Sequence, residues 1–171
     1  MAHNLLLVMQ PATHLRALAL LMAASLPGAV AAAGPAPTNG YAVYESDSSF
    51  EDVLDGLKLA IQERGMYINN VMHMGDMLTR TGKDLGTDET LYTHAQSVEF
   101  CSAVLSRKML AEAPARIVNC PFIIAVYTLP DDPGTTYVVH RQIPRTEIES
   151  SAVMHEIADM LKDVASSAVS W

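Results

Sequence analysis

Four residues that can bind a soft metal lie within six positions of the sequence: Met72, His73, Met74 and Met77. Thioether sulfur and imidazole nitrogen suit copper(I), and a histidine–methionine pair can also ligate haem iron. The segment therefore predicts a metal or ligand site, with copper or haem as the cofactor. In a strand, however, alternation places His73 on the face opposite Met72 and Met74, so the three converge only at a bend. Flexible methionines also fill apolar cores, which is the alternative interpretation.

The second candidate is a pair of cysteines, Cys101 and Cys120, which are the only two in the chain. An even cysteine count in an exported protein is typical of a disulfide. Closing a loop of about 20 residues would stabilise the fold by about 3 kcal/mol. A thiolate site for a metal or haem and a catalytic redox pair are the alternatives. The absence of a Cys-x-x-Cys motif argues against thioredoxin-type chemistry and against ordinary covalent haem attachment.

Signatures of common enzyme classes are missing from the sequence. It contains no Gly-x-Ser-x-Gly, no glycine-rich phosphate loop and no His-Glu-x-x-His. His94, His140 and His155 stand alone, and we expect each to be exposed or locally hydrogen-bonded. The sequence thus favours a binding protein for a metal, haem or other small ligand over an enzyme. A redox or electron-transfer protein that uses the cysteine pair, and a structural or partner-binding module, are the alternatives.

The N-terminal segment 1–33 differs from the rest of the chain. It contains no Asp or Glu and a single basic side chain, Arg16, followed by an apolar run and an alanine-rich end. The run is about half the roughly 20 residues that a membrane span needs. This pattern is typical of a secretory signal peptide cleaved after Ala31 or Ala33. We therefore expect a periplasmic or secreted protein, a flexible leader over 34–39, and no stable membrane insertion after cleavage.

Composition restricts the partners of the exported chain. The 171 residues carry a net charge of −8, and half of them are hydrophobic, which is enough for the core of one domain. Loss of Arg16 with the signal peptide leaves 10 basic residues against 19 acidic ones, or −9. This balance argues against a nucleic-acid partner, because phosphate contacts need clustered Lys and Arg. A small ligand, a metal or a second copy in a homo-oligomer is compatible with it.

Apolar spacing and turn residues predict the elements that must position these groups. A capping box at Ser48 and Glu51 begins a helix that ends at Gly65. Strands are predicted over 41–44, 66–74, 90–100, 121–129 and 135–143, the last two as a hairpin. Further helices are predicted over 75–86, 102–113 and 146–168. The order β-α-β-α-β-α-β-β-α indicates an α+β fold: one domain over 40–171, with helices packed on a mixed, mostly antiparallel five-stranded sheet.

This order and several short motifs resemble the family called domain of unknown function 302, over roughly Tyr41 to Pro144. The motifs are Ser49-Phe50-Glu51 to Leu57 with Gly65, Val71-Met72-His73 with Gly75-Asp76-Met77, Glu99-Phe100-Cys101 with Ala113-Pro114, Pro121 before Ile123–Tyr127, and Tyr137. The chain departs from the family pattern at Cys101-Ser102-Ala103, where members usually have Gly-Asn-Pro, and at Cys120, where they usually have Leu. The resemblance implies the α+β fold and a family histidine at His73, and it carries no biochemical role.

Overall fold

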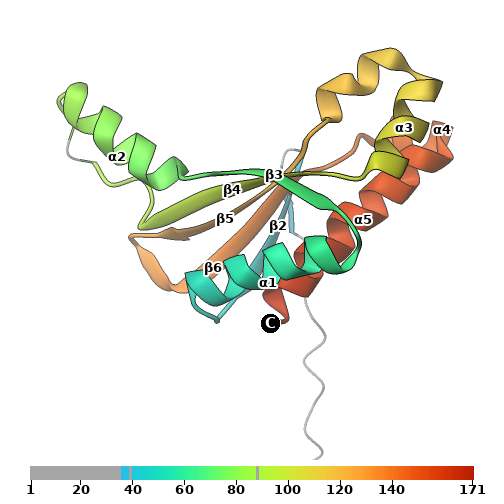
Figure 1. Ribbon diagram of the computed structural model, residues 1–171. Helices are drawn as coiled ribbons and strands as arrows, with labels where there is room; N and C mark the ends of the chain where they lie inside the picture. Colours follow the sequence, from blue (N-terminus) through green and yellow to red (C-terminus); the bar gives the residue numbers. More distant parts are fainter. Residues whose placement is uncertain (1–35, 39, 88) are drawn as a thin grey trace, which may run out of the picture. The chain divides into compact units, whose positions relative to one another are not determined.

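An antiparallel sheet of six strands forms the centre of the fold, with the strands in the order β1-β2-β6-β5-β4-β3 (Figure 1). The structure is a computed structural model that describes residues 36–38, 40–87 and 89–171. The strands are β1 (Ala36–Thr38), β2 (Tyr41–Ser46), β3 (Tyr67–Met72), β4 (His94–Cys101), β5 (Phe122–Leu129) and β6 (Asp132–Arg141). The signal peptide predicted over 1–33 lies outside the described residues.

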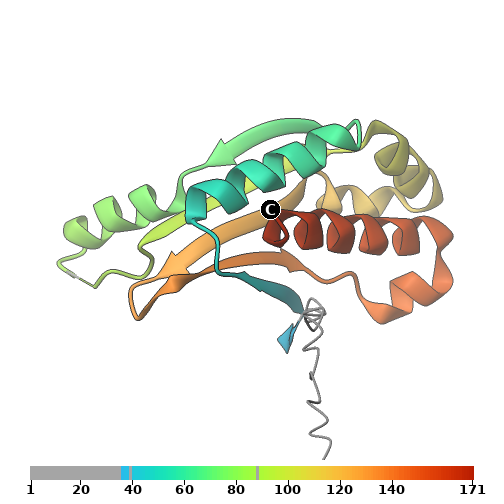
Figure 2. The ribbon, with the colours of Figure 1, turned by 90° about the horizontal axis from the view of Figure 1, so that it is seen from below.

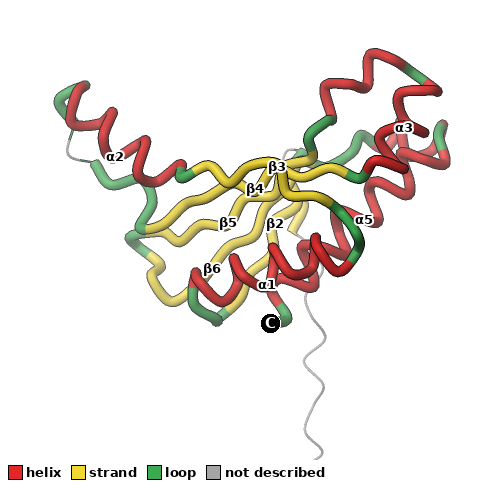
Figure 3. The backbone as a smooth tube through the Cα atoms, viewed as in Figure 1, coloured by secondary structure: helices red, strands yellow, loops and turns green. Residues whose placement is uncertain are grey.

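The two longest helices cover one face of this sheet (Figure 1), and alternate residues of the strands turn apolar side chains toward them. The helices are α1 (Phe50–Glu63), α2 (Met74–Asp84), α3 (Ala103–Glu112), the 3-10 helix η1 (Pro114–Asn119), α4 (Arg145–Ser150) and α5 (Ala152–Val169). Figure 2 shows α1 and α5 side by side across the face, where they also contact each other. Helix α3 packs against α5, and α2 leaves the end of β3 and contacts β4 (Figure 3).

The core fills the space between the sheet and the helices α1, α3 and α5. Its largest fully buried side chains are Leu57 and Ile61 of α1, Phe100 of β4, Met109 of α3, Ile124 of β5, and Met154 and Ile157 of α5. Burying each such side chain contributes about 1.5–3 kcal/mol of transfer free energy. Polar side chains also point into this layer, and His140 of β6 is among them, with 7% of its surface exposed. Among the described residues, no helix is long and apolar enough to span a membrane.

The α+β fold and the predicted order of elements are confirmed, with four differences in detail. Every strand pair is antiparallel, and β1 adds a sixth strand within the segment expected to be a flexible leader. The first helix is capped by Ser49, whose side chain accepts from the Asp52 amide, one residue after the predicted Ser48.

The predicted single helix over 146–168 is instead divided between α4 and α5. Ser151 adopts extended backbone angles (φ −147°, ψ 119°) between the two helices. Its hydroxyl accepts from the Met154 amide and so caps α5. It also contacts Glu112 and Arg116, which belong to elements far away in the sequence. Spacing along 146–168 is helical on both sides of Ser151, and therefore the pattern could not reveal the break.

Candidate functional site

A groove of about 980 Å³ lies where β2, β5 and β6 meet η1, α4 and α5. This volume is at the upper end of the range for pockets that bind small organic molecules, which is about 300–1,000 Å³. The walls are largely apolar and include Ala42, Phe122, Ile143, Ile148, Ala158 and Leu161. A surface of this kind favours a ligand with an apolar body, because burying such a body removes apolar area from water.

The polar groups inside the groove include a hydrogen-bonded pair, Tyr44 of β2 and His140 of β6. The Tyr44 hydroxyl lies 3.1 Å from His140 Nε2, and the two rings stack with centroids 5.7 Å apart. Antiparallel pairing of β2 with β6 brings the two strands together. Both side chains are buried, with 5% and 7% of their surface exposed.

The protonation state of this pair follows from a third contact. His140 Nδ1 lies 3.0 Å from the Arg141 carbonyl oxygen, which can only accept a hydrogen bond. Nδ1 therefore carries a proton, and in the neutral ring Nε2 is the acceptor. It follows that the Tyr44 hydroxyl donates to His140 Nε2.

Burial keeps both members of the pair uncharged at neutral pH. Loss of hydration lowers the pKa of His140, and this effect outweighs the hydrogen bond to the Arg141 carbonyl, which raises it. Burial, followed by the Asp163 carboxylate, raises the pKa of Tyr44 to about 12. The groove thus holds a neutral tyrosine–histidine pair with a defined direction of hydrogen bonding.

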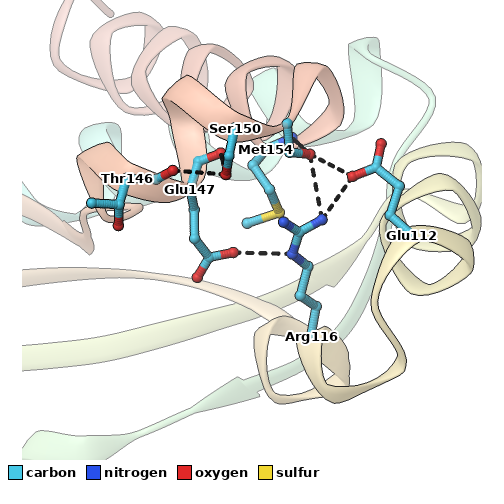
Figure 4. Close-up of polar contacts among 7 residues, drawn as sticks. Glu112, Arg116, Thr146, Glu147, Ser150 and Met154 are labelled. Atoms are coloured by element: carbon cyan, nitrogen blue, oxygen red, sulfur yellow. Dashed lines mark hydrogen bonds and ion pairs between the residues drawn. The ribbon is translucent and has the colours of Figure 1, made fainter.

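One wall of the groove is held together by Arg116 of η1 (Figure 4). Its guanidinium donates to Glu147 of α4 at 3.0 Å and to Glu112 of α3 at 2.8 Å. It also donates to the hydroxyl of Ser151, the N-cap of α5, at 3.3 Å. The Ser151 hydroxyl donates to Glu112 at 2.6 Å, and this contact, more than Arg116, lowers the pKa of the Glu112 carboxyl. The cluster connects four helices through one side chain.

The predicted histidine–methionine segment lies elsewhere, at the junction of β3 with α2. His73 is the N-cap of α2, with 61% of its side chain exposed, and its Nδ1 lies 3.9 Å from an Asp76 carboxylate oxygen. Met72 is exposed on β3, whereas Met74 and Met77 are half-buried on α2. A cavity of only about 60 Å³ adjoins His73. The residues that the structure describes contain no group of three or more His, Cys, Asp or Glu able to hold a metal.

The two cysteines meet at one end of the sheet. Cys101 ends β4, and Cys120 lies two residues before the start of β5, which pairs with β4 so that Phe100 lies opposite Phe122. The sulfur atoms are 3.5 Å apart, and both are free thiols. Burial, followed by the hydrogen bond to Cys120, raises the pKa of Cys101 to about 11.

A thiol with so high a pKa is mostly protonated at neutral pH, which disfavours Cys101 itself as a nucleophile. The predicted disulfide stays a prediction.

Sequence reasoning missed the groove and its pair. Local hydrogen bonding was expected for His140, and the bond to the adjacent Arg141 carbonyl agrees with that. Its burial was not anticipated. One signal was available: His140 follows Val138 at a spacing of two in a strand whose alternate residues are buried. That spacing placed the imidazole on the inner face, but nothing in the sequence indicated that Tyr44 lies beside it.

Comparison with known proteins gives a family without an assigned activity. The family described as domain of unknown function DUF302 matches residues 42–168. The crystal structure of an uncharacterized conserved DUF302 protein from Bacillus stearothermophilus superimposes with a TM-score of 0.58 at 15% identity. The match covers 78% of this chain and 98% of that one, and at this identity it establishes the fold alone. No curated protein matches the sequence significantly.

Proposed function

The chain belongs to the DUF302 family, and we propose from the groove of about 980 Å³ that it is an exported protein that binds a small, largely apolar organic molecule. The observation that carries the proposal is the combination of that volume with apolar walls and one buried, neutral polar pair, Tyr44 and His140. Ligand pockets in proteins usually combine these two features, because the walls supply affinity and a few polar groups supply orientation.

The position of the groove supports the same proposal. It lies between the sheet and three separate helical elements, which Arg116 connects. Side chains held by ion pairs and by a helix cap keep such a cavity open without a ligand, so less ordering entropy is lost on binding. Export remains a prediction from the leader sequence, and the periplasm is the compartment we propose.

A groove-filling substitution tests the proposal. Ala158 is half-buried on α5 and lines the groove, so Ala158→Trp should occupy the space that the ligand needs. Ala152 is exposed on the same helix and is absent from the lining, so Ala152→Trp is the matched control. The probe is N-phenyl-1-naphthylamine, a neutral dye whose fluorescence rises in apolar surroundings.

The unaltered protein and Ala152→Trp should bind the dye with equal affinity, whereas Ala158→Trp should bind it at least tenfold more weakly. Circular dichroism of each variant confirms that it is folded. Equal binding by all three proteins, or no binding by any of them, would refute a ligand role for the groove.

A further inference from the structure

The direction of the hydrogen bond between Tyr44 and His140 restricts what the groove can accept. The Tyr44 proton is used in donation to His140 Nε2, because Nδ1 is committed to the Arg141 carbonyl. The Tyr44 hydroxyl oxygen can then only accept a hydrogen bond from a ligand, through its lone pairs. A ligand atom that contacts this oxygen must therefore donate a hydrogen bond.

The cationic side chains along the groove compete with this restriction, since they could attract an anion. They are Arg116, Arg141, Arg145 and Lys162. Arg116 and Arg145 are already held by glutamate side chains. The Arg141 guanidinium lies over the Tyr41 ring, 5.6 Å from its centroid. Three of the four cations are thus engaged by other groups, so an anionic competitor in the experiment below measures what the fourth, Lys162, contributes.

From this geometry we propose that the groove selects an apolar molecule bearing a hydrogen-bond donor, such as an alcohol, a phenol or an amine N–H, and that Tyr44 Oη accepts that bond. The proposal rests on the proposed function and assigns to it a ligand class. It also assigns to His140 a positioning role, because the imidazole holds the tyrosine proton away from the ligand. Acceptor-only ligands of the same size would face an oxygen that cannot donate to them.

Three ligands with the same ten-carbon chain separate the alternatives: decan-1-ol, 1-methoxydecane and decanoate. Each competes with N-phenyl-1-naphthylamine for the groove. Decan-1-ol should bind about threefold to tenfold more tightly than 1-methoxydecane, which is the range expected for one net hydrogen bond. Decanoate should bind no better than the ether. Equal affinities for alcohol and ether would overturn the proposal, and tightest binding of decanoate would show that the cations select the ligand instead.

Two variants test the role of each residue. Tyr44→Phe should bring the ratio of alcohol to ether affinity close to one, and Tyr67→Phe, at an exposed tyrosine of β3, should leave it unchanged. His140→Leu removes the acceptor of the tyrosine proton, so Tyr44 can donate and 1-methoxydecane should gain affinity relative to decan-1-ol. A purely structural histidine would not shift this ratio.

The two proposals fail in different ways. If Ala158→Trp blocks dye binding but decan-1-ol and 1-methoxydecane compete equally well, the groove remains a ligand site. The proposal that it selects hydrogen-bond donors is then refuted. A preference that persists in both Tyr44→Phe and His140→Leu would refute the role of the pair. Absence of dye binding in the unaltered protein would refute the proposed function and, with it, this inference.

Discussion

Replacement of Tyr44 by phenylalanine removes one hydroxyl from a buried pair and should destabilise the protein measurably. The tyrosine and His140 expose 5% and 7% of their surfaces, and their hydrogen bond is 3.1 Å long. Phenylalanine keeps the ring and its stacking but leaves His140 Nε2 without a donor. An unsatisfied buried acceptor costs about 1–3 kcal/mol. We therefore expect Tyr44→Phe to lower the free energy of unfolding by about 1–3 kcal/mol, with little change in the core.

Urea denaturation followed by far-ultraviolet circular dichroism measures this difference, with the slope of the transition checked for equality between the proteins. Tyr67→Phe is the control, because Tyr67 is 73% exposed and its loss should change the free energy by less than about 0.5 kcal/mol. The double variant Tyr44→Phe with His140→Leu removes both polar partners and should recover part of the loss. A loss below about 0.5 kcal/mol in Tyr44→Phe would refute the buried hydrogen bond and the proton assignment built on it.

The remaining predictions concern acid stability, the cysteines and the exposed histidine. Because burial lowers the pKa of His140 below its unfolded value of about 6.5, the unfolded chain binds the proton first. The free energy of unfolding should therefore be highest above pH 6.5 and should fall as the pH drops toward the lower pKa that His140 has in the folded protein. His140→Gln should weaken this dependence. The same fall of stability at acid pH in that variant would contradict the prediction. In an oxidising buffer with glutathione disulfide, Cys101 and Cys120 should form a bond, since their sulfurs are 3.5 Å apart; mass spectrometry should find a crosslinked peptide, and two freely alkylated thiols would exclude it. His73→Ala should change the free energy of unfolding by less than about 0.5 kcal/mol, because 61% of the side chain is exposed. A copper(I) competition assay on the same variant tests the metal-site prediction. Equal copper(I) affinity of the variant and the unaltered protein would contradict that prediction.

Local sequence patterns determined the elements and the class of fold. Apolar spacing and a helix stop at Gly65, which has φ +68°, defined α1. The continuous apolar run of β5 and its return strand identified the hairpin. Such signals are readable because they depend on neighbours within a few residues. Cap positions and the break at Ser151 were missed, because several serines can cap a helix and contacts with distant residues decide which one does.

The candidate groove depended on pairings that no local pattern contains. Tyr44 and His140 are 96 residues apart, and only the antiparallel contact of β2 with β6 brings them together. Glu112, Arg116 and Glu147 likewise come from three helices whose packing closes one wall. The prominent sequence cluster around His73 lies instead at an exposed helix end.

Composition and periodicity thus specified which segments form helices and strands, because hydrogen bonding within an element and burial of one face are local demands. The site required the tertiary structure, because burial, the tautomer of His140 and the direction of the Tyr44 hydrogen bond arise only when distant strands pack together.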